Sequence, residues 1–183
     1  MFEQFLSRVG ACLDAHAIPY MIIGGQAVLL YGEPRLTRDI DITLGVNTDR
    51  LNDVISISKE LSLKPIPEDP ESFVKETMVL PAVDGSTGIR VDFIFSFTPY
   101  ETGAIKRARK VKVMGQEVLF ASPEDLIIHK IFAGRARDIE DARSVIVKQR
   151  DMDIGYIRAT LKNFDEGSER KDFVKVFEEM LRE

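Results

Sequence analysis

Two aspartates stand one residue apart inside an apolar stretch of this sequence, in DIDITL over residues 39–44. Asp is among the residues least favoured in β-strands, so its repeated use here needs an explanation. Successive side chains of a strand point to opposite faces, which places Asp39 and Asp41 on the same face. Neighbouring carboxylates repel each other, and a divalent cation with oxygen ligands, such as Mg²⁺, removes that repulsion. The alternative is an edge strand with a solvated acidic face.

A glycine pair precedes the aspartates. Gly24 and Gly25 follow the apolar run YMII at 20–23 and open a short helical pattern that extends to Tyr31. Backbone N–H groups at a helix N-terminus favour anions, and a residue without Cβ lets a phosphate approach closely. Glycines also serve ordinary tight turns, so the pair permits a phosphate site without establishing one.

A third carboxylate lies in RVDFIF, residues 90–95. Strand alternation places Arg90 and Asp92 on one face, while the larger apolar residues take the other. Either a base such as Arg90 or Lys75 pairs with Asp92 for structural reasons, or Asp92 joins the first two aspartates. Three carboxylates on adjacent strands are suited to the metal ions of phosphoryl transfer.

The elements expected around these residues alternate between helical and extended patterns. Helices are expected over residues 2–17, 25–31 and 47–62, and in most of the chain from Ser122 onward. Strands are expected over 20–23, 39–46, 73–83 and 89–97, with two more inside 109–121. The predicted fold class is α+β (mixed α/β). It has a mixed sheet with flanking helices over residues 1–121 and a helical C-terminal part over 122–183, packed as one structural unit.

Several charged residues in the second half of the chain can be explained by structure alone, and some of them also by contact with a ligand. Lys130 falls within the apolar arc of SPEDLIIHKIFAG, so its ammonium group must reach solvent or meet an anion, either a nearby acid or a nucleotide triphosphate. Asp138 and Asp141 in DIED fit a capping pair at a helix start. The basic run KRARKVKV, residues 106–113, fits a solvated edge strand or an RNA contact.

In their order along the chain, GGQAVLLYG, RLTRDIDITL and RVDFIF resemble the nucleotidyltransferase superfamily of the DNA polymerase beta type. More narrowly, the sequence resembles the abortive-infection AbiEii-type and related minimal nucleotidyltransferases, whose Lys–Arg–Asp-x-x-Asp motif is similar to SPEDLIIHKIFAGRARDIEDA. The resemblance implies an enzyme that uses Mg²⁺ or Mn²⁺ to transfer a nucleoside monophosphate from an NTP to an acceptor hydroxyl. The acceptor would be a tRNA, a protein or a small molecule. A toxin of a toxin–antitoxin or phage-defence pair, with a separate antitoxin protein, is also implied.

Residue roles follow from the same resemblance. It implies metal binding by Asp39, Asp41 and Asp92, which with Lys130 form the expected catalytic set. Nucleotide contacts are implied for Gly24, Gly25, Gln26, Arg35, Thr37, Lys130 and Asp138. Gln26 stands where many superfamily members carry Ser or Thr, and its amide can donate the same hydrogen bond. The alternative function is a catalytically inactive nucleotide-binding or regulatory interaction module on the same fold.

Composition narrows the protein classes. The net charge of −5 argues against a protein built mainly to coat nucleic acid. A single cysteine excludes an internal disulfide and fits a reducing compartment. The chain shows no signal peptide and no apolar run of membrane-spanning length, so we expect a cytoplasmic protein with no membrane partner. Cys12 and His16 lie one helical turn apart, but without a further Cys or His nearby in sequence we expect packing there rather than a metal site.

Overall fold

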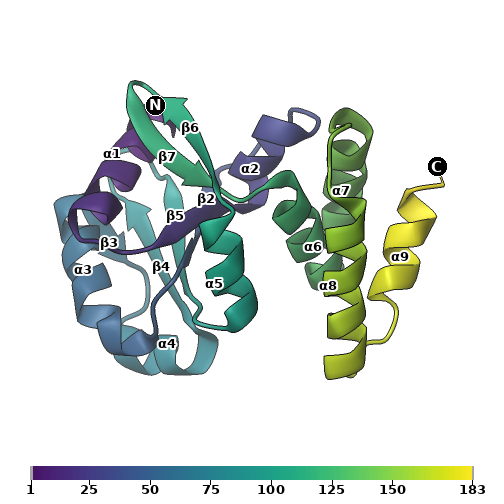
Figure 1. Ribbon diagram of the computed structural model, residues 1–183. Helices are drawn as coiled ribbons and strands as arrows, with labels where there is room; N and C mark the ends of the chain where they lie inside the picture. Colours follow the sequence, from purple (N-terminus) through teal and green to yellow (C-terminus); the bar gives the residue numbers. More distant parts are fainter. Residues whose placement is uncertain (1, 183) are drawn as a thin grey trace. The chain divides into compact units, whose positions relative to one another are not determined.

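The computed structural model describes residues 2–182, and these residues divide into two compact units (Figure 1). The first unit comprises the residues up to Gln26 together with Leu36–Ala121. The second comprises Ala27–Arg35 and the residues from Ser122 onward. The division falls inside helix α2, Gly24–Tyr31, so the chain leaves the first unit and returns to it within ten residues.

A seven-stranded mixed sheet forms the centre of the first unit, with strand order β3-β4-β5-β2-β1-β7-β6 among the described residues. The contacts of β2 with β5 and of β1 with β7 are parallel, and the other neighbours are antiparallel. The strands are β1 Tyr20–Ile23, β2 Asp39–Leu44, β3 Leu63–Pro65, β4 Val79–Asp84, β5 Arg90–Phe95, β6 Arg109–Val113 and β7 Gln116–Phe120. The mixed α/β fold class predicted from the sequence is therefore confirmed.

Helices cover both faces of this sheet. Helix α1 approaches so closely at Gly10 that a Cβ there would lie 2.9 Å from the Tyr20 hydroxyl and 3.0 Å from the Val118 side chain. Helix α5 packs through Ala104 against Met21, which points to the opposite face from Tyr20. The helices of the first unit are α1 Phe2–Ala15, the 3₁₀ turn η1 Thr48–Arg50, α3 Leu51–Glu60, α4 Pro70–Thr77 and α5 Pro99–Lys106.

The second unit consists of helices. Besides most of α2, it contains α6 Pro123–Ala133, α7 Ala136–Lys148, α8 Ile154–Gly167 and α9 Phe173–Met180. Helix α6 has a clear signal at each end, because Ser122 caps the Asp125 amide and Gly134 ends the helix in the left-handed conformation. Phe132, Phe164 and Phe173 form a ring cluster with centroids 5.4 to 6.4 Å apart, which joins α6 to α8 and α9.

One predicted strand is wrong over part of its length. Residues 70–77 form helix α4, and only Val79–Asp84 is extended. Asp69 accepts a hydrogen bond from the Ser72 amide, Pro70 starts the helix, and Met78 ends it with a φ of 60°. These end signals outweigh the apolar run that favoured a strand. The short strand β3 and helix α5 were not predicted either.

Candidate functional site

Asp39, Asp41, Arg90 and Asp92 form a patch of charged side chains on one face of the sheet, hereafter the acidic patch. Strands β2 and β5 run parallel, and their register places Asp39 beside Arg90 and Asp41 beside Asp92. Residues paired in this way project to the same face. The intervening Ile40 is fully buried on the other face. The register thus makes Asp41 and Asp92 direct neighbours and places Asp39 two residues before Asp41 on the same face.

Arg90 accompanies Asp92 within the patch. Its Nε donates to one carboxylate oxygen at 2.9 Å and its Nη2 to the other at 3.2 Å. This hydrogen bonding raises the pKa of Arg90, and the charges of Asp39 and Asp41 act in the same direction. Three carboxylates and one guanidinium leave the patch with an excess of negative charge. All its acceptors are oxygens, the ligand type that Mg²⁺ prefers, so the residues fit that ion.

Gly24 provides room for the second aspartate. A Cβ at Gly24 would lie 1.9 Å from Oδ2 of Asp41, closer than any two such atoms can approach. The residue also has a φ of +63°, a conformation that glycine adopts without strain. The Asp41 carboxylate therefore lies directly against the backbone at the N-terminus of α2. A helix N-terminus beside a carboxylate patch is suited to bind an anion and its counter-cation together.

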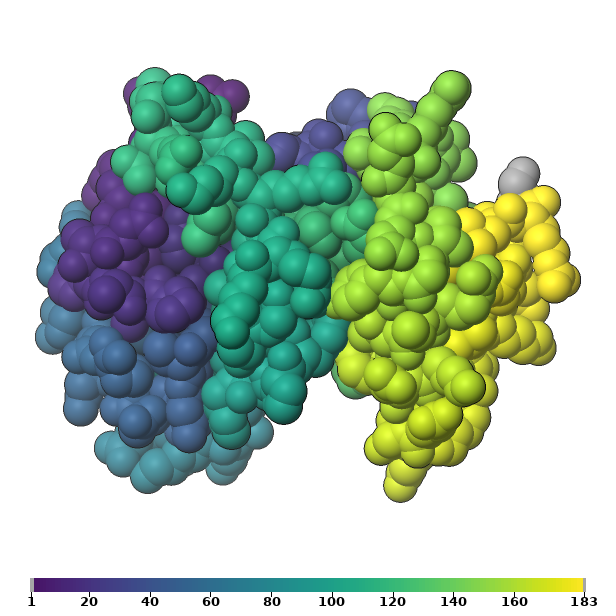
Figure 2. All heavy atoms as spheres, viewed as in Figure 1, coloured from purple at the N-terminus to yellow at the C-terminus, as the bar shows by residue number. Residues whose placement is uncertain are grey.

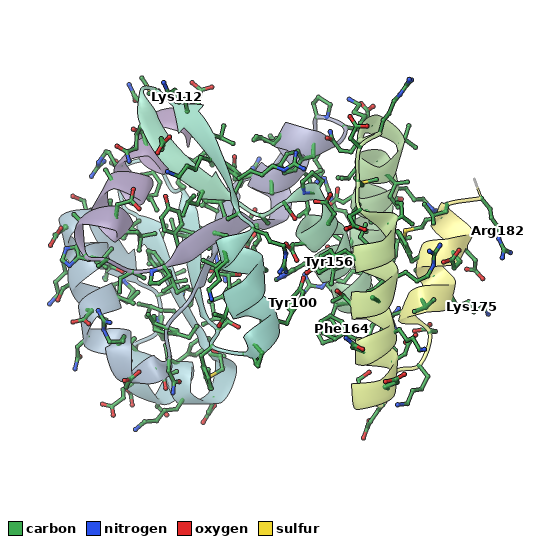
Figure 3. All side chains as sticks on the ribbon, in the orientation of Figure 1. Tyr100, Lys112, Tyr156, Phe164, Lys175 and Arg182 are labelled. Carbon is green, nitrogen blue, oxygen red and sulfur yellow. The ribbon has the colours of Figure 1, made fainter. Side chains whose placement is uncertain are left out.

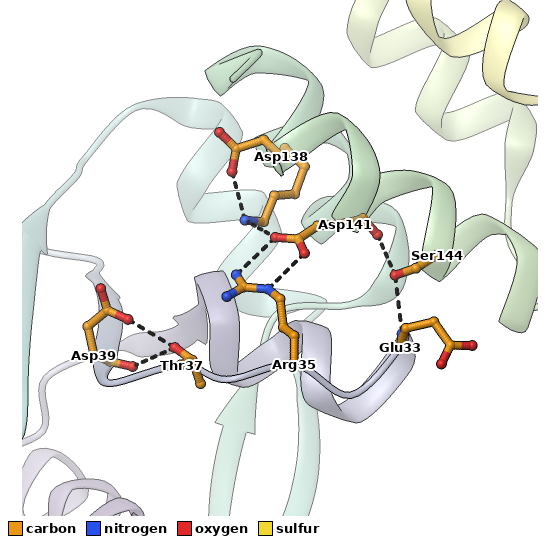
Figure 4. Close-up of polar contacts among 8 residues, drawn as sticks. Glu33, Arg35, Thr37, Asp39, Asp138, Asp141 and Ser144 are labelled. Atoms are coloured by element: carbon orange, nitrogen blue, oxygen red, sulfur yellow. Dashed lines mark hydrogen bonds and ion pairs between the residues drawn. The ribbon is translucent and has the colours of Figure 1, made fainter. Parts of the chain in front are cut away.

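Asp39 is held by two neighbours in the first unit. The hydroxyl of Thr37 donates to Oδ1 of Asp39 at 2.9 Å (Figure 4). The amide of Gln26 is buried and donates from Nε2 to the backbone oxygen of Asp39 at 3.4 Å. Both residues were expected to contact nucleotide. In the structure they orient the start of β2.

The other predicted site residues lie in the second unit, where they form an ion-pair network. Lys130 contacts Oδ1 of Asp138 and Oδ2 of Asp141, each at 2.8 Å. Arg35 binds both oxygens of Asp141, at 2.8 and 2.9 Å (Figure 4). Exposure of the Lys130, Asp138 and Asp141 side chains is at most 11%. Of the two interpretations of Lys130, the structure shows the ion pair; a contact with nucleotide stays a prediction.

The prediction that Asp138 and Asp141 cap a helix is wrong. Helix α7 begins two residues before Asp138, with Arg135 at the N-cap position and no side-chain cap. Both aspartates are instead buried and ion-paired. Burial acts to raise the pKa of Asp141, but Arg35 and Lys130 outweigh it and the pKa is lowered. The Arg35 contact spans 106 positions, which no local sequence pattern reveals.

The basic run lies on strand β6, at one edge of the sheet. Lys112 projects from this strand into solvent (Figure 3), and Lys110 pairs with Glu117 of β7 at 3.0 Å. The predicted edge strand is confirmed. Lysines on an edge discourage pairing with another chain, which accounts for the run without an RNA ligand.

Comparison with known proteins decides the family. A family model described as "Nucleotidyltransferase of unknown function (DUF6036)" matches residues 3–183. The chain belongs to this nucleotidyltransferase family. Membership in a nucleotidyltransferase family supports nucleotidyl transfer as its general activity. The narrower AbiEii-type assignment and an antitoxin partner stay predictions. No curated protein matches the sequence significantly.

Solved structures share the fold of this nucleotidyltransferase. ANT(2″)-Ia in complex with adenylyl-2″-tobramycin is 18% identical, with 88% of this chain and 97% of that chain covered and a TM-score of 0.61. A nucleotidyltransferase-like protein from Paracoccidioides brasiliensis is 19% identical, with 96% and 91% covered and a TM-score of 0.59. The lincosamide adenylyltransferase LnuA, lincomycin-bound, is 15% identical, with 75% and 91% covered and a TM-score of 0.51. Within residues 2–182, no helix of this nucleotidyltransferase has the length and apolarity needed to cross a membrane.

Proposed function

We propose that this protein is a Mg²⁺-dependent enzyme that transfers a nucleoside monophosphate from an NTP to a hydroxyl group and releases pyrophosphate. The observation that carries the proposal is the parallel register of β2 and β5, which sets Asp41 beside Asp92 and Asp39 one step away on the same face. Asp41 and Asp92 are partly buried, and carboxylates paired in this way repel each other unless a cation neutralises them.

Each residue of the acidic patch has a role in this proposal. Asp39, Asp41 and Asp92 hold Mg²⁺, which when bound neutralises the charge of the triphosphate. The backbone at Gly24 and Gly25 donates hydrogen bonds to phosphate oxygens at the start of α2. Asp92 orients the acceptor hydroxyl and receives its proton. The hydroxyl oxygen forms a bond with the α-phosphorus while the bond from that phosphorus to the bridging oxygen breaks, and its electron pair leaves on pyrophosphate.

A small-molecule hydroxyl is the first acceptor class to test. Two structural neighbours are described with an antibiotic or an adenylylated antibiotic bound. The small first unit and the short basic strand β6, where Lys110 is paired with Glu117, offer less support for a long RNA. RNA and protein acceptors are the other outcomes of the experiment.

The experiment is transfer of label from each α-³²P-labelled NTP, with Mg²⁺, to separate pools of small hydroxylic compounds, RNA and protein. We expect one pool to take up label. Asp41→Asn should reduce transfer at least about a hundredfold, ~2.7 kcal/mol of transition-state stabilisation. The matched control is Asp53→Asn, which removes an exposed aspartate paired with Arg50 in the same unit.

Two results would contradict the proposal. Transfer that survives unchanged in a folded Asp41→Asn variant would remove the acidic patch from the reaction. Tight NTP binding without transfer to any pool would support the alternative, a nucleotide-binding module that lacks catalysis.

A further inference from the structure

A second group of potential metal ligands lies in the first unit, on helices α1 and α3. The Cys12 thiol donates to one carboxylate oxygen of Glu60 at 3.3 Å, and Nε2 of His16 lies 2.9 Å from the other. The ligand atoms of all three residues lie within 4.8 Å of one another. The sequence did not predict this group, because Glu60 is 44 positions from His16.

Local helical geometry accounts for the arrangement. The His16 amide donates to the Cys12 carbonyl at 3.1 Å, so the two side chains lie one turn apart on the same side of α1. Glu60 is the last residue of α3, and α1 and α3 adjoin in the purple and blue part of Figure 2. Burial and the hydrogen bond to Glu60 raise the pKa of the Cys12 thiol to about 11, so it carries its proton at neutral pH.

We propose that Cys12, His16 and Glu60 form a Zn²⁺ site that joins α1 to α3. Thiolate, imidazole and carboxylate are the ligands that Zn²⁺ takes in proteins. The bond lengths of tetrahedral zinc separate its ligand atoms by roughly 3.3–3.6 Å, so the present separations need only small side-chain adjustments. Zn²⁺ takes the place of the thiol proton, which leaves to solvent.

The surroundings of the three ligands favour a cation. His16 and Glu60 lie at the C-terminal ends of their helices, where the carbonyl groups carry partial negative charge. One cation already lies at the end of α3, where Nη2 of Arg8 donates to the Leu61 carbonyl at 3.3 Å. The His16 and Glu60 side chains are 33% and 56% exposed, which gives a metal ion access and leaves room for water as a fourth ligand.

This site is separate from the acidic patch. Helix α1 packs on the face of the sheet that carries Tyr20 and Val118, whereas Asp41 is paired with Ile23 and shares the opposite face with Met21. The proposal therefore does not rest on the proposed function. By tying α1 to α3, zinc would stabilise the first unit, and its removal would leave the aspartates in place.

Cobalt titration tests the proposal on the full chain. Metal-stripped protein is titrated with Co²⁺ in excess Mg²⁺, which competes with Co²⁺ for sites made of oxygen ligands alone. We expect a thiolate-to-cobalt charge-transfer band in the near ultraviolet that Zn²⁺ abolishes. Because Cys12 is the single cysteine of the sequence, the band has one source. Zn²⁺ should also raise the melting temperature and slow alkylation of Cys12.

Variants separate a built site from a thiol that binds metal by itself. His16→Gln and Glu60→Gln should each lower zinc affinity at least tenfold, measured by competition with a chromophoric chelator. Glu3→Gln, which changes an exposed acid on the same helix, should leave the affinity unchanged. Absence of the cobalt band, or equal zinc affinity in the folded Glu60→Gln variant and the wild type, would overturn the proposal and leave the three residues as a hydrogen-bonded contact between helices.

Discussion

The guanidinium of Arg90 lies two residues before Asp92 on β5 and donates a hydrogen bond to each oxygen of its carboxylate. Arg90 also lies beside Asp39 across the strand pair. A cation is thus already present among the three aspartates, and its side chain is 53% exposed, free of tight packing. Any metal ion that binds Asp92 must compete with this guanidinium.

Replacement of Arg90 should therefore strengthen metal binding. Arg90→Gln removes one positive charge from the acidic patch, and we expect Mg²⁺ affinity in the absence of nucleotide to rise about tenfold, ~1.4 kcal/mol. Calorimetric titration with Mg²⁺ or Mn²⁺ measures the change. Arg158→Gln, which breaks an ion pair with Glu178 in the second unit, is the control. Weaker metal binding in Arg90→Gln would show that Arg90 orients Asp92 for the metal instead.

Gly24→Ala should disturb Asp41 in a way that a comparable substitution elsewhere does not. Gly88 in the β4–β5 turn has a similar φ of +72°, but a Cβ there meets no atom within 4 Å. Each substitution should lower the free energy of unfolding by about 1–2 kcal/mol, because alanine is strained in the left-handed conformation. Only Gly24→Ala adds the clash with Asp41, so we expect a further loss of unfolding free energy and at least a tenfold loss of transfer. Urea denaturation and the labelling assay measure the two effects. Equal behaviour of the two variants would mean that Asp41 moves aside without consequence.

Lys130→Met should destabilise the protein by about 3–5 kcal/mol, because it removes the cation that pairs with the buried Asp138 carboxylate. The double variant Lys130→Met/Asp138→Asn should recover part of that loss, since Arg35 still pairs with Asp141. Thermal and urea unfolding provide the measurement. If NTP affinity falls equally in the single and the double variant, then Lys130 contacts the triphosphate as well as the two aspartates.

Acidification should weaken the network around Asp141. Because the folded-state pKa of Asp141 is lowered, the unfolded chain binds more protons than the folded chain between that pKa and the ordinary value of about 4. The stabilisation by Asp141 is therefore present above about pH 4 and lost as the pH falls through the folded-state pKa. Asp141→Asn should flatten the fall of the urea midpoint below that pH, relative to the exposed control Asp151→Asn. Parallel curves for all three proteins would contradict this assignment.

Alternation of side chains along β2 and β5 was predictable from the sequence. Asp39, Asp41 and Asp92 each occupy the more exposed face of a strand whose apolar residues are buried. That β2 and β5 are neighbours, with Asp41 level with Asp92, depends on the order of the sheet, and strand periodicity carries no information on that order. The resemblance to known nucleotidyltransferases supplied that relationship.

Contacts between distant segments account for most of the differences from the predictions. Asp138 and Asp141 have the local pattern of a helix cap, and only the return of the chain at Arg35 turns Asp141 into a buried ion-pair partner. Similarly, Cys12 and His16 form only half of a possible metal site until α3 brings Glu60 to them. Local periodicity predicts which face a residue takes, but not what approaches that face.

The second unit is assembled from two separate stretches of chain, and this affects how the protein can be synthesised and dissected. Glu33 donates a hydrogen bond to Ser144 and Arg35 donates to Asp141. Tyr31 accepts one from Gln149, and the partners are 106 to 118 positions apart in the sequence. During translation these residues leave the ribosome long before α7 exists, and closing so long a loop is slow. A polypeptide that ended at Ala121 would keep Ala27–Arg35 but lack every partner of those residues in α7. No single cut in the chain can therefore release either unit intact.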